Sequence, residues 1–381
     1  MGFSSHDDLI SEITSGKMLS REIMKVTAPA HTAGGWHLLA GLAGYPNAGT
    51  FPGTDLLWSS CDENSGDGTT IIGPPMGGAV LSDTKHILSV GALLVAAAGA
   101  PWQAKLVDLL GYYRLSTTNV TGTGSRVLIN ANTVTASSGS GLLLTYTNDF
   151  KSGTKVRFTT SGTLPSGLAT GTDYWLIRVS TTTARVAASY ADYVAGTAIA
   201  YTDAGTGTHT MTARPGYDGV GAEAAFVVQT QPTAGGPTLS ASAYTNSAGT
   251  DSRAFQGSVT LGATADAYAT RILHSGNAAG RYGPFMPKQG ADAGILSVDS
   301  FTWSAGTAYT GSGVVALTLM RPLGVDLILP ATGVFTEKDL LNQIPSLPMI
   351  EDGACLQWLL FSTGATTNAS PFTSRVDVAW G

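Results

Sequence analysis

Short runs in which apolar and polar residues alternate recur along most of the chain. In the last run, Val376, Val378 and Trp380 point to one side. Arg375 and Asp377, which lie between them, point to the other side. Alternation with a period of two is the pattern of a β-strand with one buried face. The chain is therefore predicted to form antiparallel sheets that each have a core face.

Residues 214–381 carry eight candidate strands joined by long Gly-rich connections. Eight antiparallel strands favour a jelly roll or a related β-sandwich. The predicted strands are Ala222–Thr230, Thr238–Thr245, Arg253–Leu261, Thr270–Ser275, Ile295–Trp303, Val314–Arg321, Ala354–Ser362 and Ser374–Trp380.

The composition changes near Ser116, and from there to Ala213 the chain is rich in Thr. Six short runs separated by Gly, Ser or Asn turns predict a small β-sandwich here. We interpret residues 116–213 as a domain inserted into a jelly-roll-like main domain, whose two parts are residues 1–115, with an N-terminal arm, and 214–381. The predicted strands of the insert are Ser125–Ile129, Gly141–Tyr146, Lys155–Thr160, Asp173–Val179, Ala184–Ala188 and His209–Ala213.

Two short helices are predicted in this all-β chain. The first is capped by Ser5 and carries Leu9, Ile10 and Ile13 on one face. The second spans Glu337–Gln343, with Thr336 as its cap.

Two apolar runs follow, His86–Ala98 and Trp102–Tyr113. The second run fits either a helix that starts at Pro101 or a buried strand, because periodicity does not decide a short apolar run. The strand is the favoured interpretation of this second run.

The chain carries little charge. Charged residues make up 12% of its 381 residues, about half of the ~25% that is usual for soluble domains. A surface of small uncharged residues suits a protein held against copies of itself or a partner, although a secreted domain can have a similar composition. The net charge is −6 and no Lys/Arg-rich block occurs, so no direct contact with nucleic acid is predicted.

Neither a signal peptide nor a membrane span is predicted. The chain starts with acids where a signal peptide carries cations. The longest apolar stretch, Val90–Ala100, is far shorter than the ~20 residues that cross a bilayer. Cys61 and Cys355 form no disulfide framework and no zinc spacing, and both are expected to be buried. This usage fits assembly in a reducing cytosol.

No catalytic or cofactor-binding motif is present, and no catalytic, cofactor or metal residues are predicted. His31 and His37 are the closest histidine pair, but a metal site needs a third ligand. Asp62, Glu63, Asn64 and Asp67 only loosely resemble a calcium loop, and Glu351-Asp352-Gly353 is predicted to be a turn.

Aromatic residues are the candidates for contacts with partner subunits or ligands. Trp36, Phe51 and Trp58 lie in an irregular segment and are candidate interface anchors. Tyr174 and Trp175 are adjacent on a predicted strand, so one is expected in the core and the other outside. A platform for sugar binding is the alternative role for such residues.

Several short segments of the chain carry a resemblance to one family. In the two flanks they are Met1–Ile10, Ser82–Leu88, Leu106–Gly111, Tyr282–Pro287, Lys338–Gln343 and Asp352–Leu356. These segments resemble a family of tailed-bacteriophage virion structural proteins of the capsid decoration or cement kind. In the insert, a β-module common in phage head and tail proteins is resembled by Leu164–Leu168, Gly171–Trp175 and Thr202–Thr210.

The resemblance implies a non-enzymatic decoration or cement protein. It would be a homotrimer bound to the major capsid protein on the capsid exterior, assembled in the host cytoplasm. A tail tube, baseplate or fibre protein remains an alternative. A carbohydrate-binding module that recognises a host surface glycan through residues 116–213 is another. A glycan-degrading enzyme and a shell-forming coat protein are less favoured, since neither paired catalytic acids nor a long helix is evident.

Overall fold

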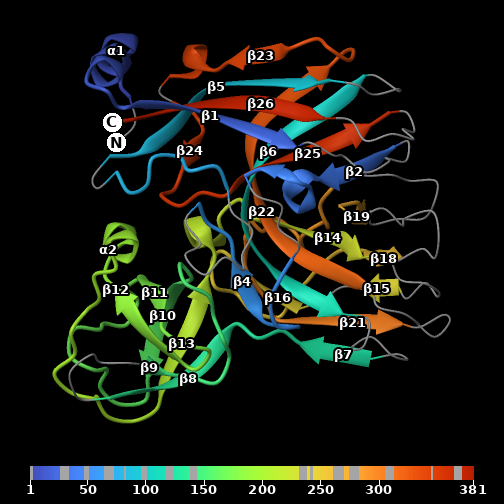
Figure 1. Ribbon diagram of the computed structural model, residues 1–381. Coiled ribbons are helices and arrows are strands. Elements are labelled where there is room, and N and C mark those ends of the chain that lie inside the picture. The colour runs from blue at the N-terminus through green and yellow to red at the C-terminus, as the bar shows by residue number, and fades with distance from the viewer. Residues whose placement is uncertain are drawn as a thin grey trace.

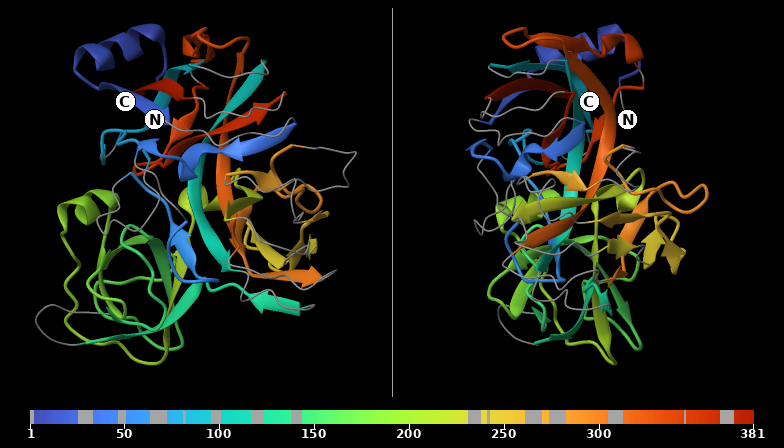
Figure 2. Two further views of the ribbon diagram at one scale, coloured as in Figure 1. Left: turned by 45° about the vertical axis from the view of Figure 1, so that its right-hand side comes forward. Right: turned by 90° about the vertical axis from the view of Figure 1, so that its right-hand side faces the viewer.

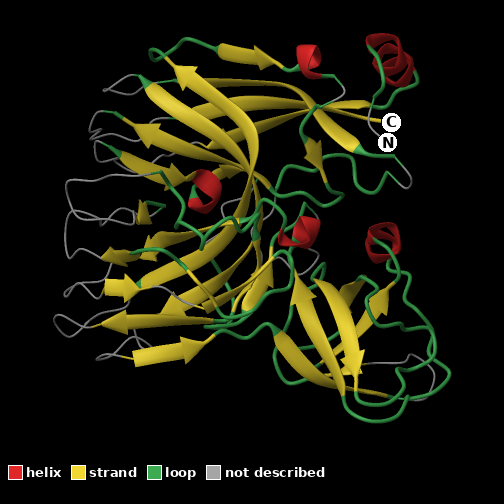
Figure 3. Cartoon of the chain, turned by 180° about the vertical axis from the view of Figure 1, so that it is seen from behind, coloured by secondary structure: helices red, strands yellow, loops and turns green. Residues whose placement is uncertain are grey.

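Strands dominate the chain, and within the described residues every ladder between two strands is antiparallel, whereas a few isolated bridges, such as Leu57 with Ile129, are parallel (Figures 1 and 3). The predicted all-β fold of antiparallel sandwich type is therefore confirmed. The computed structural model describes residues 3–25, 34–46, 51–63, 73–80, 83–95, 101–116, 124–137, 144–230, 238–240, 243–260, 270–273, 283–304, 313–344, 346–363 and 371–381.

Two large sheets pack face to face in the upper half of Figure 1. The apolar faces that meet between them include Ile23 and Val376 on one side and Leu106 and Trp358 on the other, all buried. The first sheet contains β23 (Thr336–Asp339), β5 (Lys85–Leu94), β26 (Phe372–Trp380), β1 (Met18–Lys25) and β3 (Gly44–Tyr45), with β24 (Met349–Ile350) beside β5.

The second sheet runs from the upper part of the molecule into its lower half, because its central strands are long (Figure 2). A strand of about 15 residues spans roughly 50 Å. Its strands are β19 (Ile272–Leu273), β14 (Glu223–Thr230), β22 (Val314–Leu329), β6 (Trp102–Ser116), β25 (Leu356–Ser362) and β2 (Gly35–Leu38), with β4 (Trp58–Ser60) beside β6.

β22 continues well past the predicted end at Arg321. Its register against β6 shifts between Pro322 and Val325, and Gly324 there has a positive φ of 72°. Pro cannot donate a ladder hydrogen bond, so an irregularity is the usual way to keep it inside a strand.

Two smaller sheets lie against the lower half of the second sheet. One contains β18 (Ser258–Thr260), β15 (Thr238–Ser240), β21 (Ser300–Ser304) and β7 (Gly124–Val127), and the other contains β17 (Arg253–Ala254), β16 (Ala243–Asn246) and β20 (Ile295–Val298). The three long runs predicted between Thr238 and Trp303 are thus each divided into two strands. Although β7 follows the change in composition near Ser116, it pairs with β21 and not with the strands that come next.

Six strands close into a barrel, where the sequence predicted a small sandwich. Alternate residues such as Val156, Phe158 and Leu176 fill its interior. The two ends of this segment meet, since the Ala213 N–H donates to the Asn130 carbonyl at 2.8 Å. The strands are β8 (Ala131–Ala136), β9 (Leu144–Thr145), β10 (Lys155–Thr160), β11 (Tyr174–Arg178), β12 (Thr183–Ala187) and β13 (His209–Arg214). Of these, β8 was not predicted.

The helices are few and short, and no described helix is long and apolar enough to cross a membrane. Helix α1 (His6–Thr14) is capped by Ser5 as predicted, but Ile10 is 59% exposed and does not share the buried face of Leu9. Helix α2 (Tyr190–Ala195) was not predicted. Short 3-10 helices span Leu39–Gly41, Gly216–Gly219 and Leu341–Gln343.

The helix predicted at Glu337–Gln343 is wrong. Residues up to Asp339 form β23, which pairs with β5, and only a single 3-10 turn follows. A free edge of β5 offers this segment a hydrogen-bonding partner, which outweighs its weak helical signal. The two apolar runs form β5 and β6, so the favoured strand interpretation of Trp102–Tyr113 is confirmed.

Candidate functional site

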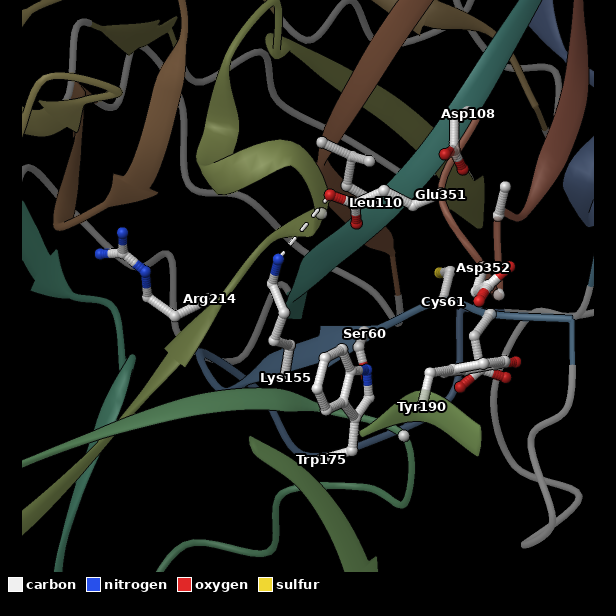
Figure 4. Close-up of a pocket in the computed structure, with 15 residues that line it drawn as sticks. Ser60, Cys61, Asp108, Leu110, Lys155, Trp175, Tyr190, Arg214, Glu351 and Asp352 are labelled. Atoms are coloured by element: carbon white, nitrogen blue, oxygen red, sulfur yellow. Dashed lines mark ion pairs between the residues drawn. The ribbon is translucent and has the colours of Figure 1, made fainter. Parts of the chain in front are cut away.

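A cleft of about 590 Å³ opens where the barrel meets the larger body. Side chains from distant parts of the chain line it: Lys155 and Trp175 come from the barrel, Tyr190 from α2, and Glu351 and Asp352 from the turn before β25. A smaller pocket of about 50 Å³, drawn in Figure 4, shares these five residues and reaches the buried Asp108 on β6.

The pleat of β11 places Trp175 in the cleft. Tyr174 points into the barrel and is only 4% exposed, whereas its neighbour Trp175 is half-buried and lines the cleft. The prediction that the two aromatic residues face opposite sides is confirmed.

Helix α2 brings Tyr190 to the same place. Ser189 caps the helix by accepting a hydrogen bond from the Asp192 N–H at 3.1 Å. Gly353, in the turn before β25, has a φ of 80°, and a β-carbon there would lie 2.6 Å from the Tyr190 ring. Glycine is therefore required for the ring to pack on the turn. The Tyr190 hydroxyl is buried and has no hydrogen-bond partner among the described residues.

Tyr217 connects two residues that line the smaller pocket, Asp108 and Glu351, through hydrogen bonds. Its hydroxyl donates to Asp108 Oδ2 at 2.7 Å and accepts from the Glu351 N–H at 3.0 Å. Its own N–H donates to Glu351 Oε1 at 2.6 Å, and the Arg321 guanidinium lies 3.9 Å from its ring centroid. Tyr217 adopts this position with a left-handed φ of 56°, which is costly for a bulky residue and is sustained by these contacts.

Burial raises the pKa values of two acids that line the smaller pocket. It raises the pKa of Asp108 to about 6, although hydrogen bonds from Tyr217 and from the Cys355 N–H at 2.8 Å oppose the shift. Burial likewise raises the pKa of Glu351, and the charge of Lys155 opposes it.

A network of ion pairs holds the barrel against the body. The Lys155 Nζ lies 3.6 Å from Asp173, 3.9 Å from Asp218 and 3.8 Å from Glu351. Arg157 bonds Asp173 and also Asp218, the latter at 2.8 Å, and Arg214 lies 3.5 Å from Asp218. Burial raises the pKa of Asp218, but these three cations outweigh it and hold the pKa below its usual value.

The arrangement offers an aromatic face, hydroxyl groups and charges of both signs around one cleft. Such a lining suits reversible binding of a small polar ligand. In the described part of the chain, no three His, Cys, Asp or Glu residues are grouped so that they could hold a metal ion.

The structure separates the predicted anchors from the surface. Trp36, Phe51 and Trp58 are each at most 6% exposed, so the prediction that they are interface anchors is wrong for the single chain. They pack instead on aromatic or apolar neighbours, as Phe51 does on Tyr112 with ring centroids 4.9 Å apart. Large aromatic residues in a Gly-rich segment look exposed in sequence, but here Trp36 and Trp58 lie on β2 and β4, which are strands of the second sheet.

The histidines and acids that the sequence analysis named do not lie together in one site. His37 is buried, His86 contacts the Leu347 carbonyl at 3.3 Å, and His209 bonds Thr160 at 2.8 Å. His31, His274, Asn64 and Asp67 lie outside the described residues.

Of the loose acidic cluster, Asp62 and Glu63 are described and buried beside the cleft, where Glu63 accepts the Met76 N–H. Glu351-Asp352-Gly353 forms the predicted turn, and the turn also lines the cleft.

Both cysteines are buried as expected, and they come together. The Cys61 N–H donates to the Leu110 carbonyl, and the Leu109 N–H donates to the Cys355 carbonyl, so the two cysteines lie beside consecutive residues of β6. Burial raises the pKa of the Cys61 thiol, and a hydrogen bond with Cys355 adds to the shift. Spacing in the sequence carries no trace of this contact.

Sequence reasoning missed most of the site. It singled out Trp175 and the turn at Glu351, but not Lys155, Tyr190, Asp108 or Tyr217. A charged residue at a regular strand position, such as Lys155, gives no signal in sequence that it faces a cleft.

Comparison with known proteins does not identify a family for the chain. No family model and no curated protein matches the chain. Its similarity to a structure titled "The 2.6A structure of Infectious Bursal Virus Derived T=1 Particles" has 11% identity and a TM-score of 0.16, and it covers 80% of this chain and 81% of that chain. A second, to "Crystal structure of infectious bursal disease virus VP2 subviral particle", has 10% identity and a TM-score of 0.16 over 95% of this chain and 81% of that one. TM-scores this low support no conclusion about fold or function.

Proposed function

We propose that the chain is a non-enzymatic structural component of a tailed-phage particle. Specifically, it would be a decoration or cement protein that binds the major capsid protein on the outside of the head as a homotrimer. Its work would be mechanical, adding contact area between the units of the shell.

One observation carries this proposal: five of the six flank segments that resemble phage virion proteins place side chains in the core between the two large sheets. Asp339, in one such segment, pairs with Ser89, directly after another. Leu356 pairs with Asp108 in the same way, which brings two more of these segments together. Residues that are far apart in sequence but share one core support a common origin for both flanks.

The form of the molecule supports the proposal as well. The barrel is carried on one side of the two-sheet body, and its two ends meet (Figure 2). An added module of this kind leaves a body free for contacts with a shell. Standard interfaces bury ~1,600 Å², and many repeated copies stabilise a shell without strong individual binding.

Labelling of particles tests the location. Gold-labelled antibody against this chain should decorate the heads of the phage that encodes it. Label on tails would contradict the decoration role and favour a tail protein, and particles without label would contradict both. Heads that lack the chain should also release DNA at a lower temperature than complete heads.

The proposed oligomer is tested with the purified chain. Light scattering coupled to size exclusion should give three times the 39.0 kDa of one chain. A monomer over the whole accessible concentration range would contradict the trimer.

A further inference from the structure

We propose that the cleft between the barrel and the body binds a neutral saccharide, stacked on Trp175. This site goes beyond the structural role above and would stand even if the chain were not a decoration protein. Its volume of about 590 Å³ lies within the ~300–1,000 Å³ of typical ligand pockets.

The aromatic wall is the first reason. Trp175 is half-buried on the outside of the barrel and lines the cleft, while its neighbours in the barrel wall pack inward. The C–H face of a sugar ring is apolar and flat, so an indole ring shields it from water while the hydroxyl groups point sideways. Trp175 is not part of the barrel core, and it packs instead against the cluster of Ala187, Tyr190 and Tyr193, which holds the indole beside Tyr190 at the cleft.

The polar wall is the second reason. The Tyr190 hydroxyl is buried at the cleft without a hydrogen-bond partner among the described residues. A buried hydroxyl left unpaired costs free energy, which a ligand hydroxyl would recover. The Lys155 Nζ stands 3.6–3.9 Å from three carboxylates, and none of these distances is that of a hydrogen bond. Figure 4 shows the Lys155 ammonium directed toward Glu351, and in this position its N–H groups would donate to sugar oxygens.

Charge selects the ligand class. The cleft carries the carboxylates of Glu351 and Asp352 against the single ammonium of Lys155. Asp352 is further compensated by Lys85, whose Nζ lies 3.1 Å away. A site of nearly balanced charge gives a phosphate group little net attraction, and it offers donors and acceptors together. Hydroxyl groups, which are both donors and acceptors, match this lining.

Saturation-transfer NMR and titration calorimetry with defined probes test the proposal. The probes are di- to tetrasaccharides of glucose, galactose, mannose and N-acetylglucosamine, with choline and inorganic phosphate as non-sugar probes. At least one neutral sugar should bind the full chain. Trp175→Ala should weaken that binding at least tenfold, while Trp175→Phe should retain part of it. Tyr190→Phe, which removes one hydroxyl, should weaken it roughly fivefold, the equivalent of one hydrogen bond.

Matched controls separate binding from folding. Val179→Ala alters a residue that is 52% exposed just after β11, outside the cleft, and should leave the affinity unchanged. Near-ultraviolet circular dichroism should show every variant folded; if Trp175→Ala is not, Tyr190→Phe alone decides. A folded chain that binds none of the sugars would overturn the proposal. So would binding of choline or phosphate without any sugar, or sugar affinity that Trp175→Ala or Tyr190→Phe leaves unchanged.

Discussion

At the scale of single residues, Tyr217 joins the barrel linker to the body through one hydroxyl and its own N–H. Tyr217→Phe keeps the ring, the backbone angle and the Arg321 contact, but it leaves Asp108 Oδ2 and the Glu351 N–H without this partner. An unpaired buried group costs ~1–3 kcal/mol, so the free energy of unfolding should fall by about that amount. Urea denaturation measures it. Tyr45→Phe, at a tyrosine that is 45% exposed, should change little, and equal effects of the two variants would refute this role.

The acid beneath Tyr217 predicts a dependence on pH. Burial raises the pKa of Asp108 to about 6 in the folded chain, above the ~3.9 of an exposed aspartate. The folded state therefore binds the proton more tightly, and stability falls as pH rises from about 4 to about 6. Each unit of difference between the folded and unfolded pKa corresponds to about 1.36 kcal/mol of stability. The total loss of stability from Asp108 is therefore at most ~3 kcal/mol.

Asp108→Asn should remove this part of the pH dependence. Urea unfolding of both proteins between pH 4 and pH 7 measures the difference. The stability of the original chain should decline relative to the variant as pH rises and then level off above about pH 6. A constant difference across this range would show that Asp108 does not titrate there.

At the scale of elements, the ion-pair network joins strands β10 and β11 to the 3-10 turn at Asp218. Asp218 has a φ of 50°, a conformation that Asn also adopts readily, so Asp218→Asn isolates the charge. The variant leaves Lys155, Arg157 and Arg214 with less compensation, and about 1 kcal/mol of stability should be lost because the site is partly exposed.

Salt distinguishes this network from simple packing. The melting temperature of the original chain should fall with added NaCl more than that of Asp218→Asn. Asp326→Asn removes the ion pair with Lys105. Because the Asp326 side chain is 40% exposed, this variant should leave the salt dependence of the melting temperature almost unchanged. Identical salt dependence of all three proteins would contradict a stabilising network.

At the scale of the whole molecule, the barrel is attached by ends that already meet. Deleting Ala131–Thr212 and joining Asn130 to Ala213 with a short Gly-Ser linker should leave a folded body, because these two residues are hydrogen-bonded at 2.8 Å. Body residues such as Leu110 and Trp58 lose barrel neighbours in their shared core, so the melting temperature should fall. Circular dichroism measures both effects, and a disordered product would show that the body needs the barrel.

Local pattern determined much of this architecture from sequence alone. Alternation located Lys155–Thr160 at its observed bounds and separated Tyr174 from Trp175, because the pleat of a strand depends only on neighbouring residues. The cap at Ser5 was equally readable, since its hydrogen bond reaches only to Asp8.

Tertiary structure alone decided the pairings and the site. Residues 336–339 became a strand because β5 offered a free edge, and β7 joined β21 across about 175 residues of sequence. Lys155, Tyr190 and Glu351 lie far apart in the sequence and line one cleft only because the chain folds back on itself. Alternation specifies which face of a strand is buried, but not which partner covers it, so the cleft appears only when the strands have paired.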